Sequence, residues 1–478
     1  MGECCAATCA SQVARVLARV PARVLDVTRA PRAKSRDGRK RDKPRRWIAR
    51  QAPPMDRAAS TECESHFKWR PRHAPIYWRG SALLHRINSQ GMPNTVVESP
   101  AHPFGAWRVQ FPLLERAIPM NNCSQGPQSL RARAAALAFL DTWNERGMDW
   151  DEWLEAVQGA KAAFAALINA SVHDIAVFSS VSDATSAFMS ALDFSGDRNV
   201  VVASEAEFPT IGHVALAQAP RGAQVRWVSL RDGHIDRGEY HTMVREDTRV
   251  VCATHAHFVT GALQDITAIT QLAHSRGALA LVDAYQSIGA VPIDVVRWGV
   301  DALVAGTQKY LLGTPGIAFL YVRPGLVEQL HPTVTGWFGR AQPFAFDVGR
   351  LDWALGAARF DTGTPPAINA YIARASMELI GEVGVAGIRE WTQALSDRLV
   401  RGAHVRGLAV LGPVDAAAKG PTTALIVDGD SGVIERRMRE RGVIASARGP
   451  VVRLAPHFFT TLDECDQALD ALVWAMRA

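Results

Sequence analysis

The fold of this chain is decided by residues 277–323, which read GALALVDAYQSIGAVPIDVVRWGVDALVAGTQKYLLGTPGIAFLYVR. The stretch holds three short apolar runs bounded by turn residues, a pattern typical of buried strands, at 278–282, 301–305 and 316–322. The first run leads into Asp283, and the second leads through Gly-Thr-Gln to Lys309. Ligands of open α/β sheets bind beyond the carboxyl ends of the strands. The pattern therefore predicts that Asp283 and Lys309 share one site.

An Asp and a Lys that lie 26 residues apart, each at a strand end, suit one chemistry well. A lysine amine forms a Schiff base with an aldehyde cofactor. A carboxylate keeps a pyridine nitrogen protonated, so that the ring acts as an electron sink. The alternative is that Asp283 caps a helix and Lys309 is a surface lysine. That alternative leaves Gln286, the small residues before Lys309 and the Gly/Pro turn after it unexplained.

Two segments carry a family resemblance, V-D-A-Y-Q-S-I-G at 282–289 and G-T-Q-K-Y-L-L-G-T-P-G at 306–316. They resemble the class V aminotransferases, a family of fold-type I pyridoxal 5′-phosphate (PLP) enzymes, and within it the kynureninase-like or isopenicillin-epimerase-like branch. The resemblance extends from about Phe111 to the C-terminus. It implies an α/β fold: a large domain with a central, mostly parallel seven-stranded sheet flanked by helices, and a small C-terminal α/β domain. It also implies PLP on Lys309, with Asp283 at the ring nitrogen.

Composition bounds the class of protein. The chain has 478 residues, 48% of them hydrophobic, which is enough for a large core and more than one domain. No apolar run is long enough to span a bilayer, so no membrane association is predicted. The net charge of +6 is uneven, because residues 1–50 hold 14 Lys/Arg against 4 Asp/Glu, and nucleic-acid binding by the remainder gains no support. The seven cysteines form no disulfide framework, which favours a reducing, cytoplasmic location.

Three segments are predicted from the order of these patterns. Residues 1–105 are rich in Arg, Ala and Pro and form a basic extension that is disordered, a transit peptide, or the product of a misassigned start codon, with Met55 or Met92 as the true start. We favour disorder or misassignment. Residues 106–383 form the large PLP-binding domain, and residues 384–478 form the small domain. Helices are expected at 130–145, 150–169, 367–380, 385–402, 431–441 and 462–476, and strands at 174–179, 199–203, 225–229, 249–254, 422–427 and 451–454.

A hydroxyl-rich turn follows the strand expected at 174–179 and leads into a helix. Free N–H groups and the dipole at a helix start favour an anion such as phosphate, although Ser and Thr are also ordinary N-caps. By resemblance, Val181 and Ser182 offer backbone and hydroxyl to the cofactor phosphate. The resemblance also gives Gln308 to the phosphate and Gln286 to the ring oxygen or the phosphate. Phe208 stacks on the pyridine face by resemblance, and core packing is its alternative role.

Residues that contact the substrate or a second subunit are predicted by resemblance alone. Arg453 clamps the substrate α-carboxylate, which suits the two parallel bonds of a guanidinium, and the alternative is a surface Arg on a strand. Asn122 and Ser124 contact the substrate or are simple turn residues. Trp337 and Thr364 enter the neighbouring subunit's active site, which implies a homodimer with shared sites; alternatively, the Gly-Thr-Pro-Pro around Thr364 is only a turn.

The predicted function is that of a PLP-dependent enzyme acting on a small-molecule α-amino acid through Schiff-base and carbanion chemistry, of aminotransferase type, with Lys309 as proton shuttle. Alternatives are a kynureninase-like hydrolase, a C–S or C–C lyase, an epimerase, and a non-catalytic PLP-binding scaffold. Kynureninases have Asp, His, Tyr and Asn at the positions of Ile211, Gln286, Gln308 and Thr364, which weakens that assignment. His255 and His257 lack a third ligand nearby, and no metal is predicted.

Overall fold

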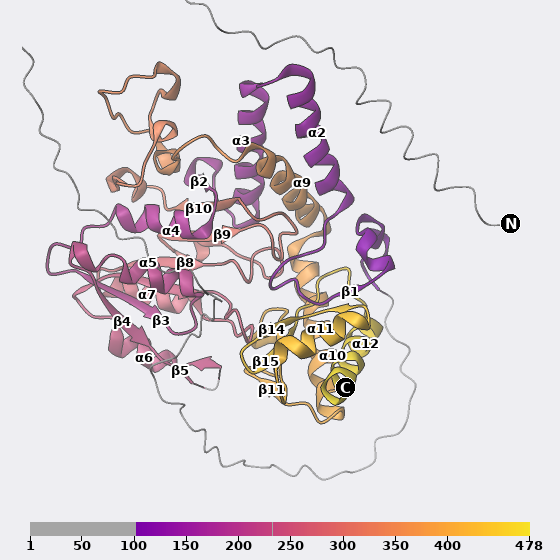
Figure 1. Ribbon diagram of the computed structural model, residues 1–478. Helices are drawn as coiled ribbons and strands as arrows, with labels where there is room; N and C mark the ends of the chain where they lie inside the picture. The colour runs from indigo at the N-terminus through magenta and orange to yellow at the C-terminus, as the bar shows by residue number, and fades with distance from the viewer. Residues whose placement is uncertain (1–101, 232) are drawn as a thin grey trace, which may run out of the picture. The chain divides into compact units, whose positions relative to one another are not determined.

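The computed structural model describes residues 102–231 and 233–478 (Figure 1). The predictions about residues 1–101, namely the basic extension and a start at Met55 or Met92, lie outside the described residues. The first described residues already contact the C-terminal part, because the His102 ring bonds the carbonyl of Thr460 at 3.0 Å. In the part of the chain that the structure describes, no helix is long and apolar enough to cross a membrane.

A seven-stranded sheet forms the centre of the larger part (Figure 1). Its strands, in spatial order, are β2 (Ile175–Phe178), β10 (Ala318–Val322), β9 (Ala302–Gly306), β8 (Leu279–Asp283), β7 (Thr248–Thr254), β3 (Val200–Ser204) and β4 (Gln224–Val228). Neighbouring strands run parallel except at β10, which is antiparallel to both β2 and β9. The predicted mostly parallel seven-stranded sheet is therefore confirmed.

Helices cover both faces of this sheet, and its central strands are therefore apolar on both faces, which explains the apolar runs in the sequence. Every residue of β9 and β10 is buried, as expected for strands of a parallel sheet with helices on both sides. Alternate residues enter two different cores: Leu303 packs in one and Val304 in the other. The first core includes residues of α3 (Trp150–Leu167), α7 (Ile266–Ser275) and α9 (Ala367–Val383), and the second includes those of α4 (Val181–Ser190) and α5 (Pro209–Leu216).

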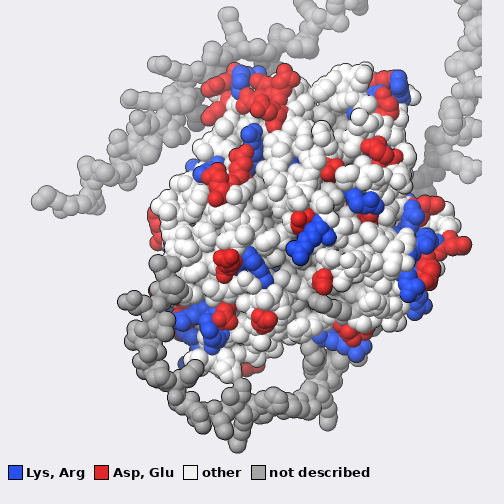
Figure 2. Space-filling view, turned by 180° about the vertical axis from the view of Figure 1, so that it is seen from behind, with Lys and Arg blue, Asp and Glu red and all other residues white. Residues whose placement is uncertain are grey.

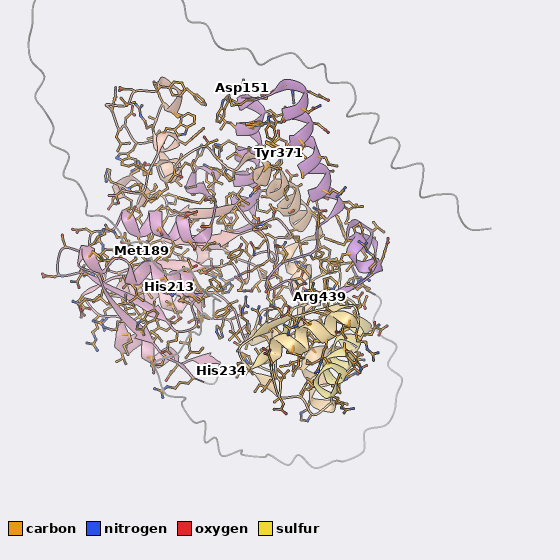
Figure 3. The ribbon with its side chains drawn as sticks, viewed as in Figure 1. Asp151, Met189, His213, His234, Tyr371 and Arg439 are labelled. Atoms are coloured by element: carbon orange, nitrogen blue, oxygen red, sulfur yellow. The ribbon has the colours of Figure 1, made fainter. Side chains whose placement is uncertain are left out.

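The helices lie near their predicted positions. Helix α2 (Leu130–Arg146) packs with α3 and α9 as a bundle at one end of the sheet (Figure 1). In Figure 3, Asp151 of α3 and Tyr371 of α9 are labelled in this bundle, and the Tyr371 hydroxyl donates to Glu152 of α3 at 3.0 Å. Among the described residues, the larger part also contains two short α-helices, α6 (Arg237–Met243) and α8 (Val295–Trp298).

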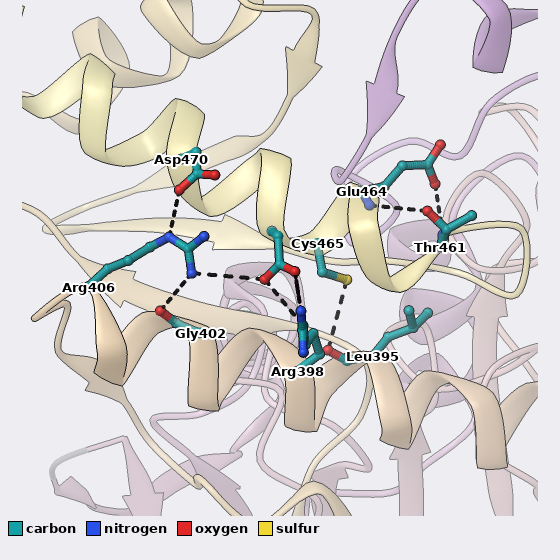
Figure 4. A network of polar contacts seen from close by, with 9 residues as sticks. Leu395, Arg398, Gly402, Arg406, Thr461, Glu464, Cys465 and Asp470 are labelled. Atoms are coloured by element: carbon teal, nitrogen blue, oxygen red, sulfur yellow. Dashed lines mark hydrogen bonds and ion pairs between the residues drawn. The ribbon is translucent and has the colours of Figure 1, made fainter. Parts of the chain in front are cut away.

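A second, four-stranded antiparallel sheet lies in the C-terminal part, in the order β11 (Val410–Leu411), β12 (Thr423–Ile426), β15 (Val451–Leu454) and β14 (Ser446–Arg448). It packs with α10 (Val385–Val405), α11 (Ser431–Glu440) and α12 (Leu462–Arg477) around an apolar core. Figure 4 shows the polar edge of this packing, where Arg406, the residue directly after α10, donates to Asp470 of α12 at 2.7 Å. The division into domains at residues 383 and 384 stays a prediction.

Several short elements were not predicted. Strand β1 (Ile118–Pro119) pairs in parallel with β13 (Val443–Ile444), and β5 (Leu230–Arg231) pairs with β6 (His234–Ile235). The β1 pairing places the following segment, residues 120–126, against the C-terminal part, because the Ala455 N–H donates to the Met120 carbonyl at 2.7 Å. On the face seen in Figure 2, basic and acidic side chains are interspersed among uncharged residues.

A buried ion pair anchors the loop that carries Thr364. Lys161 Nζ of α3 lies 2.6 Å from Asp361 Oδ2, and both residues are buried. The other oxygen, Asp361 Oδ1, accepts the Val177 N–H of β2 at 2.8 Å. One carboxylate thus connects a helix, the edge strand of the sheet and the loop that begins at Asp361.

Replacing Lys161 by Ala should lower the free energy of unfolding by about 3–5 kcal/mol, because it leaves the Asp361 carboxylate buried without a cation. Urea unfolding followed by circular dichroism measures this. The control is Arg401→Ala, which breaks the exposed pair between Arg401 and Asp397 and should cost under about 0.5 kcal/mol. Equal losses in the two variants would contradict the anchoring role.

Candidate active site

A cavity of about 280 Å³ lies at the carboxyl ends of the central strands. It brings together seven of the residues predicted from sequence: Val181, Ser182, Phe208, Asp283, Gln286, Gln308 and Lys309. Its remaining lining consists of Ser179, Ser180, Thr210, Thr254, Phe258, Tyr285, Pro315, Gly316 and Ile317. Asp283 ends β8 and Lys309 follows β9, so two adjacent strands deliver these two side chains to one space, as predicted.

Two aromatic rings hold the lysine. Lys309 Nζ lies 4.0 Å from the centre of the Tyr285 ring and 5.5 Å from that of Phe208. The Tyr285 ring fits there because Gly306 has no side chain: a Cβ at that position would lie 2.4 Å from the Tyr285 hydroxyl oxygen. Residue 306, three positions before Lys309, is therefore a glycine because the Tyr285 ring leaves no room for a side chain.

Burial sets the protonation of the Asp283 and Lys309 pair. Removal from water lowers the pKa of Lys309 to about 8, although the Asp283 charge opposes this shift. Burial also raises the pKa of Asp283, while the N–H of Tyr285, which donates to its carboxylate at 2.8 Å, and the charge of Lys309 act to lower it. Above pH 8 the Lys309 amine is largely neutral and can act as a nucleophile or a base.

The amino end of α4 opens into the same cavity. Ser180 is the N-cap, and its hydroxyl accepts the Asp183 N–H at 3.1 Å. The first N–H groups of a helix have no acceptor within the helix, so those of Val181 and Ser182 suit an anion. The Ser182 and Thr210 hydroxyls lie 3.1 Å apart beside them. The Asp183 carboxylate accepts the Ser180 hydroxyl at 2.8 Å, so the charge of Asp183 is partly met by a neighbouring donor.

Two glutamines connect the cavity to the segment 120–126. Gln308 Nε2 donates to the Ser124 carbonyl at 3.2 Å, and Gln286 Nε2 donates to the Cys123 carbonyl at 3.1 Å. Gln286 Oε1 is buried and has no hydrogen-bond partner. Gly126 lies so close to the lysine segment that a Cβ there would be 2.8 Å from the Lys309 carbonyl oxygen. Gln286, a residue of the cavity lining, thus keeps one buried acceptor without a partner.

Arg453 lies in β15 close to the cavity but does not line it. Its Nη2 donates to the Ser124 hydroxyl at 3.0 Å and to the Ser446 hydroxyl at 2.6 Å, and its Nη1 donates to the Phe258 carbonyl at 2.5 Å. The Phe258 ring meets Phe208 edge-on at 5.3 Å. The structure therefore brings Arg453 and Ser124 together next to the aromatic wall, and Arg453 is buried, unlike a surface arginine.

Asn122 has a different placement from its predicted neighbours. Its side chain is fully buried, and Nδ2 donates to the carbonyls of Pro119 and Ala455 at 3.2 and 2.7 Å. It is absent from the lining of the cavity around Lys309. In this structure Asn122 fixes the path of the main chain.

His457, which the sequence did not single out, joins Arg453's segment to the lysine segment. Its Nε2 bonds the Tyr310 carbonyl at 2.9 Å, and its Nδ1 accepts the Phe458 N–H at 2.8 Å. These partners require a neutral ring with hydrogen on Nε2. Burial lowers the pKa of His457 to about 4, which keeps the ring neutral. The residue after Lys309 is therefore held directly by the C-terminal part.

Trp337 and Thr364 do not line the cavity of their own chain. Trp337 packs among aromatic side chains, edge-on to Trp150 at 5.9 Å and stacked on Phe346 at 5.9 Å. Thr364 lines a separate cavity of about 310 Å³ together with Lys161. Phe346 is 70% exposed, so this aromatic group is open to a partner.

The two histidines after β7 contact different partners. His255 Nδ1 lies 2.8 Å from the Ser287 hydroxyl, and His257 Nδ1 lies 2.9 Å from the Thr260 hydroxyl. Among residues 102–231 and 233–478 there is no group of three His, Cys, Asp or Glu side chains that could hold a metal ion. Burial lowers the pKa of His255 to about 3, so this ring is neutral.

Sequence reasoning missed Tyr285 and Thr254, which line this cavity, and Glu207, which does not line it but accepts the Thr254 N–H. Tyr285 lies in the quoted V-D-A-Y-Q pattern, and its position two residues after Asp283 was the available signal. Glu207 lies directly before Phe208, but the sequence Ser-Glu-Ala-Glu-Phe holds two glutamates and does not show which one is buried. The structure buries Glu207 and exposes Glu205.

Comparisons with known proteins agree with this geometry. The sequence model of the family described as "Aminotransferase class-V" matches residues 149–455. The chain is 36% identical to the Uncharacterized aminotransferase YcbU of Bacillus subtilis, over 77% of this chain and 96% of that protein. It is 29% identical to a kynureninase of Pseudomonas fluorescens, over 76% of this chain and 90% of that protein. These matches confirm the predicted resemblance.

The fold is also shared with solved structures. A C-DES variant with glycine covalently linked to its PLP cofactor superposes on this chain with a TM-score of 0.70 at 20% identity, covering 77% of this chain and 98% of that chain. At this identity the likeness concerns the fold alone. It confirms the predicted fold-type I architecture.

The lowered pKa of Lys309 predicts that its amine reacts with an aldehyde at a lower pH than an ordinary lysine does. Reductive methylation with formaldehyde and a borane reductant should be half-maximal at Lys309 near pH 8 in the folded protein freed of small molecules, because only the neutral amine reacts with the aldehyde. In urea-unfolded protein the midpoint should move to about 10.4, the ordinary lysine value. Peptide mass spectrometry resolves the sites, and Lys161, buried against Asp361, should react slowly at every pH. A folded-state midpoint near that of the unfolded chain would refute the assigned environment.

Proposed function

We propose, because the chain belongs to the class V aminotransferase family, that it uses PLP to act on an α-amino acid as an aminotransferase-type enzyme. The observation that carries this proposal is the placement of Asp283 and Lys309 in one buried cavity beside the amino end of α4. The C-DES relative of known structure binds glycine through a PLP cofactor. A cavity with one amine, one carboxylate and an anion site offers the three groups that PLP needs.

The chemistry of the cavity fits this cofactor. Gln286 Oε1 is a buried acceptor without a partner, which suits the ring hydroxyl of PLP. The N–H groups of Val181 and Ser182 and the hydroxyls of Ser182 and Thr210 would hold the phosphate. Phe208 is the flat side chain available to the pyridine face. Gln308 lines the same cavity and would contact the phosphate.

When bound, PLP supplies an aldehyde that condenses with an amine and a ring that takes up the electron pair left at Cα. The Asp283 carboxylate would hold the proton of the ring nitrogen. It is buried, and Lys309 is the cation among the groups that shift its pKa. Lys309, whose amine is neutral above pH 8, would first carry the cofactor and then move a proton at Cα. Arg453 and Ser124 would receive the substrate carboxylate beside the Phe208–Phe258 wall.

A hydrolytic reaction of kynureninase type is the second candidate. The kynureninase relatives favour it. It is weakened because Gln286 and Gln308 offer no titratable group to activate water, and because Ile211 is a fully buried apolar side chain. Arg453 favours either enzyme over a cofactor-binding scaffold, which has no need of a carboxylate clamp.

The active unit that we propose is a homodimer with shared sites. Trp337 and Thr364 lie outside their own chain's cavity, and the aromatic group around Trp337 includes the exposed Phe346 and Phe344. Exposed apolar surface of this kind is typical of protein interfaces. Both residues would then reach the cofactor of the second subunit. A cytoplasmic location remains a prediction from cysteine usage.

Replacing Lys309 should abolish both cofactor attachment and turnover. Wild-type protein mixed with PLP should gain the visible absorbance of a lysine-bound aldehyde, and Lys309→Ala and Lys309→Arg should not. Turnover should fall by roughly 10³-fold or more, because the amine is the proton carrier. A screen of amino acids with product analysis then separates the candidates. Transfer of the amino group to a 2-oxo acid supports the proposal, and side-chain hydrolysis supports the second candidate. The absence of a spectral response to every amino acid tested would refute both candidates.

The shared-site dimer predicts recovery of activity in mixed subunits. Lys309→Ala and Thr364→Asp should each be inactive alone, the second because its charge would repel the phosphate. Co-expression should restore about one quarter of the wild-type activity, since half of the dimers are hybrids with one intact site each. Steady-state rates of the purified mixture measure this. Full activity of Thr364→Asp alone, or no recovery in the mixture, would show that Thr364 does not serve the second subunit.

A further inference from the structure

Glu207 is a buried acid that the proposed reaction does not use. It lies between β3 and α5 and is only 6% exposed. Its Oε1 accepts two hydrogen bonds, from the Ser204 hydroxyl at 3.0 Å and from the Thr254 N–H at 2.6 Å. Its Oε2 is buried and has no hydrogen-bond partner. The two oxygens of one carboxyl group therefore have opposite environments.

This asymmetry is that of a neutral acid. A carboxylate accepts hydrogen bonds on both oxygens, whereas a protonated carboxyl has one accepting oxygen and one that carries hydrogen. A buried carboxylate oxygen without any donor is costly. Both donors that reach Glu207 meet at Oε1, and burying an unpartnered neutral O–H at Oε2 costs less than burying an unpartnered charged oxygen there, so the arrangement favours the proton on Oε2.

The charge of Asp283 is a second reason for Glu207 to be neutral. Thr254, whose N–H donates to Glu207, is the strand partner of Asp283 across β7 and β8. Two carboxyl groups so placed cannot both ionise at low cost. Asp283 faces Lys309 and the Tyr285 N–H, whereas the ionisable groups acting on or facing Glu207 are Asp283 and two neutral ones, Tyr240 of α6 and Cys252 of β7. The proton therefore belongs on Glu207.

Further contacts fix the frame around this acid. Gln264 Nε2 donates to the Thr254 carbonyl at 2.7 Å, and the Tyr240 hydroxyl donates to Gln264 Oε1 at 3.0 Å. Thr254 is therefore held on its N–H by Glu207 and on its carbonyl by Gln264. Burial and the Asp283 charge raise the pKa of Glu207 to about 8, in agreement with the donor pattern.

We propose that Glu207 is a positioning residue for Asp283, held as the neutral acid with its hydrogen on Oε2, so that the Asp283 carboxylate is not opposed by a second negative charge on Glu207. Its role toward the cofactor rests on the proposed function. Its protonation and its hold on Thr254 do not, and they can be measured without PLP.

The first test is the pH dependence of stability in cofactor-free protein. Unfolded Glu207 ionises near its ordinary value, and folded Glu207 stays neutral up to about pH 8. Wild type should therefore lose stability relative to Glu207→Gln as pH rises between these values. The difference in Tm should grow by about 5 °C from pH 5 to pH 8.5 and then level off. Glu205→Gln is the matched control, because Glu205 is exposed and two residues away. A Tm difference that does not change with pH would overturn the proposal.

The second test needs no Glu207 variant to fold. Wild-type protein labelled with ¹³C at the glutamate carboxyls should show one resonance that titrates near pH 8. In folded Asp283→Asn that midpoint should be lower, because the neighbouring charge is removed. Absence of any glutamate titrating above pH 7 would overturn the assignment even if every Glu207 variant misfolds.

The third test concerns the cofactor. Glu207→Gln, which preserves the accepting oxygen, should keep kcat within about twofold of wild type, whereas Glu207→Ala, which leaves the Thr254 N–H without an acceptor, should lower kcat about tenfold or more with little change in KM. Equal losses in both variants would remove the positioning role. If Lys309→Ala retained activity while the stability and carbon resonances behaved as expected, the proposed function would fail and the neutral Glu207 would stand.

Discussion

The structure depends on one constraint, the burial of an amine and a carboxylate in the same small cavity. Removal from water pushes both Lys309 and Asp283 toward their neutral forms, and the charge of each opposes that shift in the other. The fold offsets the cost of burying both groups because the parallel strands β8 and β9 end side by side. These two rigid strands fix the positions of Asp283 and Lys309. The aromatic rings of Tyr285 and Phe208 then cover the amine and keep the space around it poorly solvated.

The part of this arrangement that could be predicted from sequence is the part encoded locally. Buried parallel strands must be apolar on both faces, so β8 and β9 appear in the sequence as uninterrupted apolar runs, and their predicted ends lie within one residue of the observed ones. The same holds for the turn at Ser180, where hydroxyl residues follow a strand and start a helix. Asp283 and Lys309 were assigned to the site because each lies at or shortly after a strand end, whereas Ser182 and Phe208 were assigned by resemblance.

The rest could not be read from local pattern because it depends on segments far apart in the chain. Gln286 meets the carbonyl of Cys123, and Arg453 meets Ser124, across separations of more than 160 residues. Whether Glu205 or Glu207 turns inward is decided by Ser204 and Thr254 and not by composition. The short pairing of β1 with β13 carries too few residues to show any periodicity, yet it fixes the path of the segment that borders the cavity.

The imidazole of His457 has a consequence for the α-amino acid that we propose as substrate. It ties the peptide next to Lys309 to the segment after Arg453, and the Tyr310 hydroxyl lies 2.8 Å from that of Thr422. These bonds restrain the spacing between the Arg453 guanidinium and the Lys309 amine. A restrained spacing would suit the carboxylate and amino groups that all α-amino acids share. Discrimination among the proposed substrates would then come from the residues that surround the side chain.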